Sequence, residues 1–282
     1  MVIASMNNKG GVGKTASTGT IAQVLAIGDY KVLVIDMDQQ GNCSRLFGID
    51  SDVEGLDYAK LFCERISKEE AYNFIYQSNF KNIHILPASH QLIDMPIILY
   101  EEDKNNPAAL LNFKKNIEAI AEDYDIVLID TPPGYDKYYT RSLLMATDKI
   151  IVPSEVDNAS YEGVSNLVPL VKEVNDKYCL NIEFAGVFFT RVKERCNLFK
   201  SMNDSYAEIF GEYFLPVSIR DTIAMHESYT AFVPLYLWDR KCTAFRDYVE
   251  LVGVLGIMDK AHWKHARKAL EENIDMRAEE EE

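Results

Sequence analysis

The chain has 282 residues, of which 48% are hydrophobic and 26% are charged. This composition is typical of a folded globular protein and excludes an intrinsically disordered chain. No apolar run approaches the ~18–20 residues that a membrane-spanning helix needs, and the N-terminus lacks the pattern of a secretory signal. The sequence therefore predicts a cytoplasmic protein of one or two domains.

The net charge of −15 is unevenly distributed along the chain. Residues 1–180 carry 16 basic and 26 acidic side chains, residues 181–270 carry 12 and 11, and the last twelve residues carry 1 and 7. A basic face for nucleic acid is therefore predicted only in the C-terminal third. The five cysteines are widely spaced without a C-x-x-C pair, which indicates reduced thiols rather than a zinc or iron–sulfur site.

Short apolar runs rich in β-branched residues alternate with helical stretches along the chain. This pattern predicts an α/β fold with a mostly parallel twisted sheet of about seven or eight strands and helices on both faces. We expect helices at Thr15–Ile27 and Tyr161–Tyr178, and mainly helical structure over residues 54–80 and 92–122. The expected strands are Val2–Met6, Lys31–Asp36, Ile83–Pro87, Asp125–Asp130, Lys149–Pro153, Phe184–Thr190 and Phe214–Ser218. Residues 1–260 are expected to form a single domain, followed by a C-terminal helix and acidic tail over residues 261–282.

A glycine-rich loop joins the first predicted strand to the first predicted helix. Its glycines let several backbone N–H groups point at one anion, and the helix N-terminus adds partial positive charge. In such loops the lysine contacts the β- and γ-phosphates of a nucleotide and the following hydroxyl binds Mg²⁺, which predicts these roles for Lys14 and Thr15. The general pattern has glycine where Asn8 stands. We predict that ATP or ADP is bound by Lys9, Gly10, Gly11, Val12, Gly13, Lys14, Thr15 and Ala16.

Carboxylates end two of the later predicted strands. Asp36 and Asp38 close one strand and, being two residues apart, face the same side of it. Asp130 ends another strand, directly before a rigid Pro-Pro-Gly turn. Buried strands that deliver a carboxylate to a phosphate loop commonly hold Mg²⁺. The magnesium ligands predicted from these patterns are Thr15 and Asp130.

Together these motifs resemble those of the ParA/MinD family of deviant Walker A ATPases, a branch of the P-loop NTPases. The resemblance covers residues 1 to about 256 and is most specific in the first 45 residues and around 125–134. It implies a homodimer that sandwiches ATP, in which Lys9 reaches the partner's nucleotide and Lys14 its own. It also implies that Asp36 lies nearer the magnesium shell, as a further magnesium ligand, and that Asp38 positions the attacking water. Lys9, Lys14 and Asp38 would then form the catalytic set of an ATPase with a weak intrinsic rate. Here Gln39 replaces the proline that the family usually has after this aspartate.

The resemblance further implies a DNA-partition ATPase that binds DNA without sequence preference and is switched off when a centromere-binding ParB-type protein stimulates hydrolysis. Such a protein would associate with the nucleoid. The segment Leu215–Asp221 resembles the one that closes the base pocket in this family. Because the sequence starts directly at its first predicted strand, no N-terminal helix-turn-helix is expected. The candidate DNA contacts are Arg191, Lys193, Arg195, Arg220, Lys241 and Arg246.

Three alternative functions stay open. A MinD-like ATPase would act on a membrane through a C-terminal amphipathic helix, but the acidic end of the chain would be repelled by anionic lipid, so no stable membrane association is expected. A reductase or metal-cluster carrier would need a cysteine pair, and Cys43 and Cys63 lack the spacing. A ParA-like ATPase that regulates or positions another machine, for example in conjugation or export, would differ in having no affinity for DNA.

Overall fold

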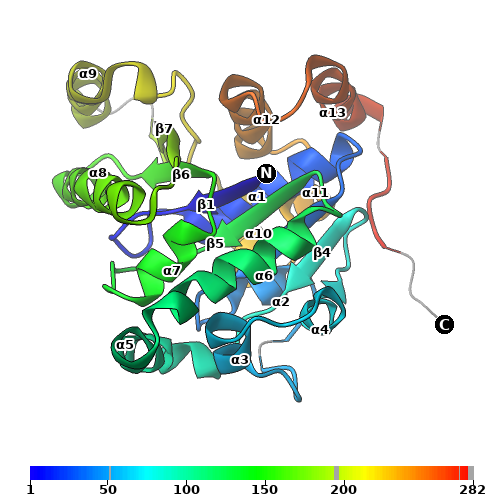
Figure 1. Cartoon of the computed structure of the whole chain (residues 1–282). Coiled ribbons are helices and arrows are strands. Elements are labelled where there is room, and N and C mark those ends of the chain that lie inside the picture. The colour runs from blue at the N-terminus through cyan, green and yellow to red at the C-terminus, as the bar shows by residue number, and fades with distance from the viewer. Residues whose placement is uncertain (51, 194–196, 273, 279–282) are drawn as a thin grey trace.

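The computed structural model describes residues 1–50, 52–193, 197–272 and 274–278. Within these residues one sheet of seven strands lies between two layers of helices (Figure 1). The order of the strands is β3-β4-β2-β5-β1-β6-β7, and every pair is parallel except β3 with β4. The predicted α/β fold is therefore confirmed. The strands are β1 (Val2–Ser5), β2 (Val32–Asp36), β3 (Tyr76–Gln77), β4 (Ile83–Leu86), β5 (Ile126–Asp130), β6 (Lys149–Ser154) and β7 (Glu183–Phe189).

The helices cover both faces of the sheet because neighbouring residues of each central strand point to opposite sides. In β1, Val2 and Ala4 belong to one hydrophobic core and Ile3 to the other. The first core is closed mainly by α3 (Tyr58–Cys63), α5 (Met95–Asn105), α6 (Asn112–Ala121), α7 (Tyr139–Met145) and α8 (Asn158–Tyr178). The second is closed by α1 (Lys14–Ile27), α11 (Leu235–Asp239), α12 (Thr243–Leu255) and α13 (Lys260–Glu272). The shorter or peripheral elements are α2 (Asn42–Leu46), α4 (Lys68–Tyr72), η1 (His90–Ile93), η2 (Pro107–Leu111), α9 (Asn197–Phe210), η3 (Gly211–Tyr213) and α10 (Ile223–Thr230).

Two sequence-based expectations about strands were wrong. The segment Phe214–Ser218 is not a strand, although it runs beside β7, where the N–H of Leu215 donates to the Val187 carbonyl (2.8 Å). Pro216 has no N–H to donate, which interrupts a ladder at this point, and the segment makes only an isolated bridge, between Phe214 and Val187 of β7. Residues 54–80 are not helical throughout, because they contain the antiparallel edge strand β3 after α3 and α4.

The carboxyl ends of three neighbouring strands bring the predicted motifs to one edge of the sheet. β5 lies between β1 and β2, so that Asp130 pairs in register with Ser5 on one side and with Asp36 on the other. The loop that follows β1 leads directly into α1. Ligands in open α/β sheets bind at such an edge, just beyond the ends of the strands.

Candidate functional site

The loop between β1 and α1 has the backbone shape of an anion receptor. Gly11 and Gly13 have φ angles of 81° and 87°, in the left-handed region that residues with a Cβ rarely adopt. Gly13 is the N-cap of α1, and no side chain caps this end of the helix in the described chain. The first N–H groups of α1 and its positive dipole end are therefore directed at the space above the loop.

Lys14 lies across this loop without a direct ion pair to a described residue. Its side chain is buried, and Nζ donates to the carbonyls of Asn7 and Lys9, both at 3.0 Å. Burial lowers the pKa of Lys14, while the charges of Asp130 and Asp38 act in the opposite direction. A buried cation held by neutral carbonyls strongly favours a nearby anion, because the anion offsets the cost of desolvation.

The loop is held in place by Asn7, a residue that the sequence motifs did not identify. Asn7 is fully buried, its Nδ2 donates to the Pro153 carbonyl (2.9 Å), and its Oδ1 accepts from the N–H of Lys9 (3.0 Å). The first turns of α8 pack on it so closely that a Cβ on Gly163 would lie 2.2 Å from Asn7 Oδ1. Gly163 therefore has no room for any side chain.

Replacing Gly163 with alanine is expected to displace Asn7 and distort the phosphate loop. The free energy of unfolding should fall by about 1–3 kcal/mol, as for other overpacked sites, and the affinity for ATP should fall about tenfold. Chemical denaturation and equilibrium ATP titration would measure the two effects. Val168→Ala, an exposed position on the same helix, serves as the control. An unchanged ATP affinity in Gly163→Ala would show that Asn7 does not support the loop.

Asp36 and Asp130, at the ends of β2 and β5, differ in the hydrogen bonds that their carboxylates accept. Asp36 Oδ2 accepts from both the N–H and the Oγ–H of Ser44, each at 2.7 Å, and Asp36 Oδ1 accepts from the N–H of Asp38 (3.2 Å). Both oxygens of Asp130, which is also fully buried, have no hydrogen-bond partner of acceptable geometry among the described residues. Burial and then the charge of Asp36 raise the pKa of Asp130 well above its usual range, although the neighbouring Thr15 hydroxyl acts to lower it. Asp130 is thus the carboxylate best placed to gain from a cation.

Replacing Asp130 with asparagine is expected to raise the melting temperature of the protein in the absence of Mg²⁺. An unpaired buried carboxylate opposes folding, and its raised pKa means that this cost appears as the pH rises and the group ionises. The gain should therefore be larger at pH 8 than at pH 5, and added Mg²⁺ with ADP should stabilise the variant less than the wild type. Thermal unfolding with and without Mg²⁺ would test this, with the exposed Asp94→Asn as control. A variant that melts at or below the wild-type temperature in EDTA at pH 8 would contradict the prediction.

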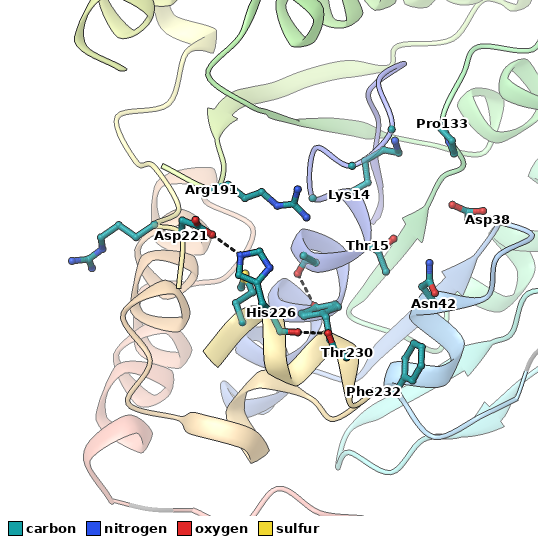
Figure 2. A pocket seen from close by; sticks show the side chains of 17 residues that line it. Lys14, Thr15, Asp38, Asn42, Pro133, Arg191, Asp221, His226, Thr230 and Phe232 are labelled. Carbon is teal, nitrogen blue, oxygen red and sulfur yellow. Dashed lines mark hydrogen bonds and ion pairs between the residues drawn. The ribbon is translucent and has the colours of Figure 1, made fainter. Parts of the chain in front are cut away.

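A pocket of about 450 Å³ opens over the loop, between α1 and α10 (Figure 2). Asp38, Asn42 and Pro133 lie on one side of Lys14 and Thr15, whereas Arg191, Asp221 and His226 lie on the other. The volume is in the range of sites for nucleotide-sized ligands. The lining residues are Gly10, Gly11, Gly13, Lys14, Thr15, Ala16, Asp38, Asn42, Pro133, Arg191, Arg220, Asp221, Met225, His226, Tyr229, Thr230 and Phe232.

The sequence motifs did not identify the α10 side of this pocket. The Tyr229 hydroxyl donates to the carbonyl of Ala16 (2.9 Å) and so fixes α10 to the start of α1. His226 Nε2 lies 2.7 Å from Asp221 Oδ1, at the mouth of the pocket. Tyr229 and His226 follow the loop by more than 200 residues in the sequence. Neither stands at a spacing from other residues that would mark it as part of a nucleotide-binding motif. Only the resemblance of Leu215–Asp221 to a base-pocket segment pointed to this region.

Lys9 lies on the outer side of the loop and contacts two carboxylates of its own chain. Its Nζ bonds to Glu155 Oε2 and Asp157 Oδ2, at the end of β6 and the N-cap of α8. Burial alone would lower the pKa of Lys9, but the hydrogen bonds to Asp157 and Glu155 outweigh burial and raise it. Lys9 is therefore charged, and in this conformation it is directed at its own subunit.

Comparison with known proteins agrees with this geometry. A family model described as an AAA domain matches residues 1–185 of the 282. Soj from Bacillus subtilis, a sporulation initiation inhibitor protein, is 27% identical over 251 residues, which are 89% of this chain and 96% of that protein. The chromosome-partitioning ATPase Soj from Treponema pallidum is 27% identical over 87% of this chain and 93% of its own length. The chain belongs to the ParA/MinD-type family of AAA-domain ATPases.

The solved structures extend the likeness over the fold. The septum site-determining protein MinD from Pyrococcus horikoshii, solved with Mg-ADP, superposes with a TM-score of 0.68 at 20% identity. The match covers 92% of this chain and 98% of that one. The C-terminal third of this chain, beyond the AAA-domain match, is thus part of the same architecture as in the ParA/MinD family.

The candidate DNA contacts differ in how closely acidic side chains of this ParA/MinD-type ATPase engage them. Arg191 pairs with Glu155 (3.0 Å) and Arg220 with Asp247, and both arginines line the nucleotide pocket. Lys193 is 80% exposed and lies 3.8 Å from Asp221. The side chains of Lys241 and Arg246 are exposed around the start of α12, while Arg195 lies outside the described residues. Their role in DNA binding stays a prediction.

The C-terminal helix α13 packs against the ATPase fold. The indole N–H of Trp263 donates to the Val249 carbonyl of α12 (2.7 Å), and Ala266 and Ala269 are buried in the second core. Among the described residues no helix is both long and apolar enough to span a bilayer. The proposed division into residues 1–260 and a separate helix and tail over 261–282 stays a prediction.

Proposed function

We propose that this chain is a DNA-partition ATPase that dimerises around ATP, binds DNA without sequence preference and is switched off by partner-stimulated hydrolysis. The observation that carries the proposal is the arrangement of Lys14, Asp38 and Asp130 around the start of α1, in a chain 27% identical to a chromosome-partitioning ATPase over 87% of its length. The fold alone supports a nucleotide site but not a purpose.

The chemistry of the site supports ATP with Mg²⁺ as the bound species. The loop N–H groups and Lys14 would hold the phosphates, and Ala16 lies at the start of the pocket that would take the nucleoside. The carboxylate oxygens of Asp130, which have no hydrogen-bond partner among the described residues, and the hydroxyl of Thr15 fit a magnesium ion. Asp36 already accepts two hydrogen bonds from Ser44, so it would act on the water shell of the ion. When bound, Mg²⁺ would neutralise phosphate charge. Asp38, which lines the pocket beyond Lys14, would orient the water that attacks.

Dimerisation would add a second lysine to each nucleotide. A cation over the γ-phosphate stabilises the charge of the transition state and makes association depend on ATP. Lys9 is the candidate, because Lys14 already occupies its own loop. We expect Lys9→Ala to bind ATP as a monomer with affinity close to that of the wild type but to lose the ATP-dependent dimer. Light scattering with ATP would measure this, and an ATP-induced mass shift that persists in the variant would exclude a trans role for Lys9.

DNA binding is tested most directly by a gel shift with unrelated duplex DNA, with and without ATP, over a salt series. Binding that needs ATP and weakens steeply with salt would support partition, because phosphate contacts release counterions. Lys241→Ala combined with Arg246→Ala should reduce the salt dependence, since both side chains are exposed. A ParB-type partner would then accelerate hydrolysis on DNA. No binding at low salt, with ATP present, would exclude the DNA function.

The second candidate is a ParA-like ATPase that regulates or positions another machine without binding DNA. The observation that favours it is that Arg191 and Arg220 are engaged by acids beside the pocket, which leaves fewer cations for DNA. The structural likeness to a septum site-determining protein fits it equally at the level of the fold. Anchoring through α13 is not supported, because Trp263 is packed against α12.

A further inference from the structure

A second cavity lies among the helices α5, α7 and α8, which cover one face of the sheet (Figure 1). Its volume is about 190 Å³, and none of its lining residues lines the nucleotide pocket. Three cations line it, Lys137, Arg141 and Lys177, together with two carboxylates, Asp103 and Glu173. The volume is below that of typical sites for drug-sized ligands, so the cavity suits one small polar group.

Arg141 is the most buried of the three cations. Its side chain is 14% exposed, and its Nη2 donates to Glu173 Oε1 (2.5 Å), which joins α7 to α8. The Nε of Arg141 is buried and has no hydrogen-bond partner among the described residues. Glu173 is itself 54% exposed, so it can be displaced at little cost. An oxyanion in its place can accept from Nε and Nη2 together, which is the preferred geometry of a guanidinium.

The two lysines have aromatic partners. Lys137 Nζ lies 5.1 Å from the ring centre of Tyr138, and Lys177 Nζ lies 4.9 Å from that of Tyr178. The pKa of Lys177 is raised by its hydrogen bond to Tyr178 and also by the charge of Asp103. Both lysines are exposed and therefore charged. Three cations against two carboxylates give the cavity a net charge of +1, in a chain whose net charge is −15.

Helix α7 connects this cavity to the nucleotide site. At its start Asp136 Oδ1 accepts from the N–H groups of Tyr138 and Tyr139, each at 2.7 Å. The buried Tyr139 hydroxyl donates to the carbonyl of Met37 (2.7 Å), the residue before Asp38. A shift at the start of α7 would therefore reach the backbone beside Asp38 through one hydrogen bond.

We propose that this cavity is an effector site for a phosphate group, free or as the ester of a small molecule. Arg141 binds the phosphate through two N–H groups, and Lys137 and Lys177 pair with its remaining charge. A phosphate ester carries about −1.5 to −2 charges at pH 7 and three strong acceptor oxygens, which is enough to engage all three cations. A carboxylate brings only one charge. The site depends neither on DNA binding nor on dimerisation.

The test is isothermal titration of glycerol 3-phosphate and of inorganic phosphate, at constant ionic strength, into protein whose phosphate loop is saturated with Mg-ADP. We expect a dissociation constant on the order of 1 mM, about tenfold weaker binding in Arg141→Gln and about threefold weaker binding in Lys137→Gln and in Lys177→Gln. Lys172→Gln is the matched control, because it removes an exposed lysine of α8 that does not line the cavity. The two exposed lysine variants keep the test valid if melting curves show that Arg141→Gln does not fold.

The two probes distinguish the sources of the phosphate group. Tighter binding of the ester assigns the site to a phosphorylated small molecule, and tighter binding of inorganic phosphate assigns it to the free ion. No binding of either probe below about 10 mM overturns the site, and so does binding that is equally strong in the three cavity variants. A glutamate-rich peptide that binds more tightly than both probes overturns the assignment to phosphate.

The effector role has a separate readout in the rate of ATP hydrolysis. Saturating glycerol 3-phosphate is expected to change this rate about fivefold in the wild type, but not in the double variant Lys137→Gln with Lys177→Gln. Tyr139→Phe should bind the ester as the wild type does and lose the change in rate, because it lacks the hydroxyl that reaches Met37. A wild-type rate that stays unchanged although the ester is bound overturns the effector role, and an undiminished response in Tyr139→Phe overturns the route through α7.

Discussion

Replacing Lys14 with alanine is expected to abolish nucleotide binding. The side chain places a buried ammonium over a loop whose N–H groups face the same space, and it has only two backbone carbonyls as partners within the loop. Loss of a charge-assisted contact to phosphate should lower the affinity for ATP at least about 100-fold. Isothermal titration of ATP and ADP with Mg²⁺ would measure it.

The control for this experiment is the exposed Lys115→Ala on α6, which changes the net charge by the same amount. Lys14→Ala should also be folded, since a desolvated lysine contributes little to stability without its anion. ATP affinity within threefold of the wild type in a folded Lys14→Ala protein would refute the assignment of the loop.

Replacing Asp38 with alanine is expected to stop hydrolysis and leave binding intact. Asp38 lines the pocket on the side of Pro133, away from His226 of α10, and its Oδ1 accepts a hydrogen bond from the N–H of Gln40 (3.0 Å). Loss of a group that orients the attacking water should slow turnover by about 10²–10⁴-fold. Phosphate release under saturating ATP would measure the rate, and light scattering should find a dimer that persists in ATP.

Gln40→Ala is the control for Asp38→Ala, because it keeps the N–H that bonds to Asp38 and changes only an exposed side chain of the same turn. Undiminished phosphate release in Asp38→Ala would exclude a water-positioning role. Slow release together with lost ATP binding would instead assign Asp38 to the ground-state site.

The phosphate loop and the strand that ends at Asp130 could be predicted from the sequence, because each is formed by consecutive residues. The strand before Lys9, the glycines of the loop and the helix after Lys14 follow one another in the chain, and the apolar run before Asp130 indicates a buried strand. Each element has its own hydrophobic periodicity or turn residues, which predict the α/β fold. In parallel sheets ligands bind at the carboxyl ends of the strands, so these motifs were expected to lie together at that edge.

The residues that pack against the phosphate loop, and the partners of the pocket arginines, could not be predicted in the same way. Asn7 and Gly163 matter because a helix formed 150 residues later packs on the loop, and no spacing in the sequence encodes that contact. Arg191 and Arg220 were interpreted as surface cations because their acidic partners, Glu155 and Asp247, are distant in sequence. The strand predicted at Phe214–Ser218 failed for a similar reason, since its apolar residues cover the edge of β7 without pairing along it.

Helix α8 connects the region around Lys9 to a distant part of the protein surface. It has 21 residues, which corresponds to about 30 Å at 1.5 Å per residue. Its second turn rests on the loop through Gly163, and its last turn, near Lys177 and Tyr178, lies at the far end of the helix from that contact. Even a small tilt at the loop end is therefore magnified into a displacement of ångströms at Tyr178. A protein bound there could distinguish the ATP-bound from the ADP-bound state without touching the nucleotide, and a fluorophore attached at that end would report the same difference.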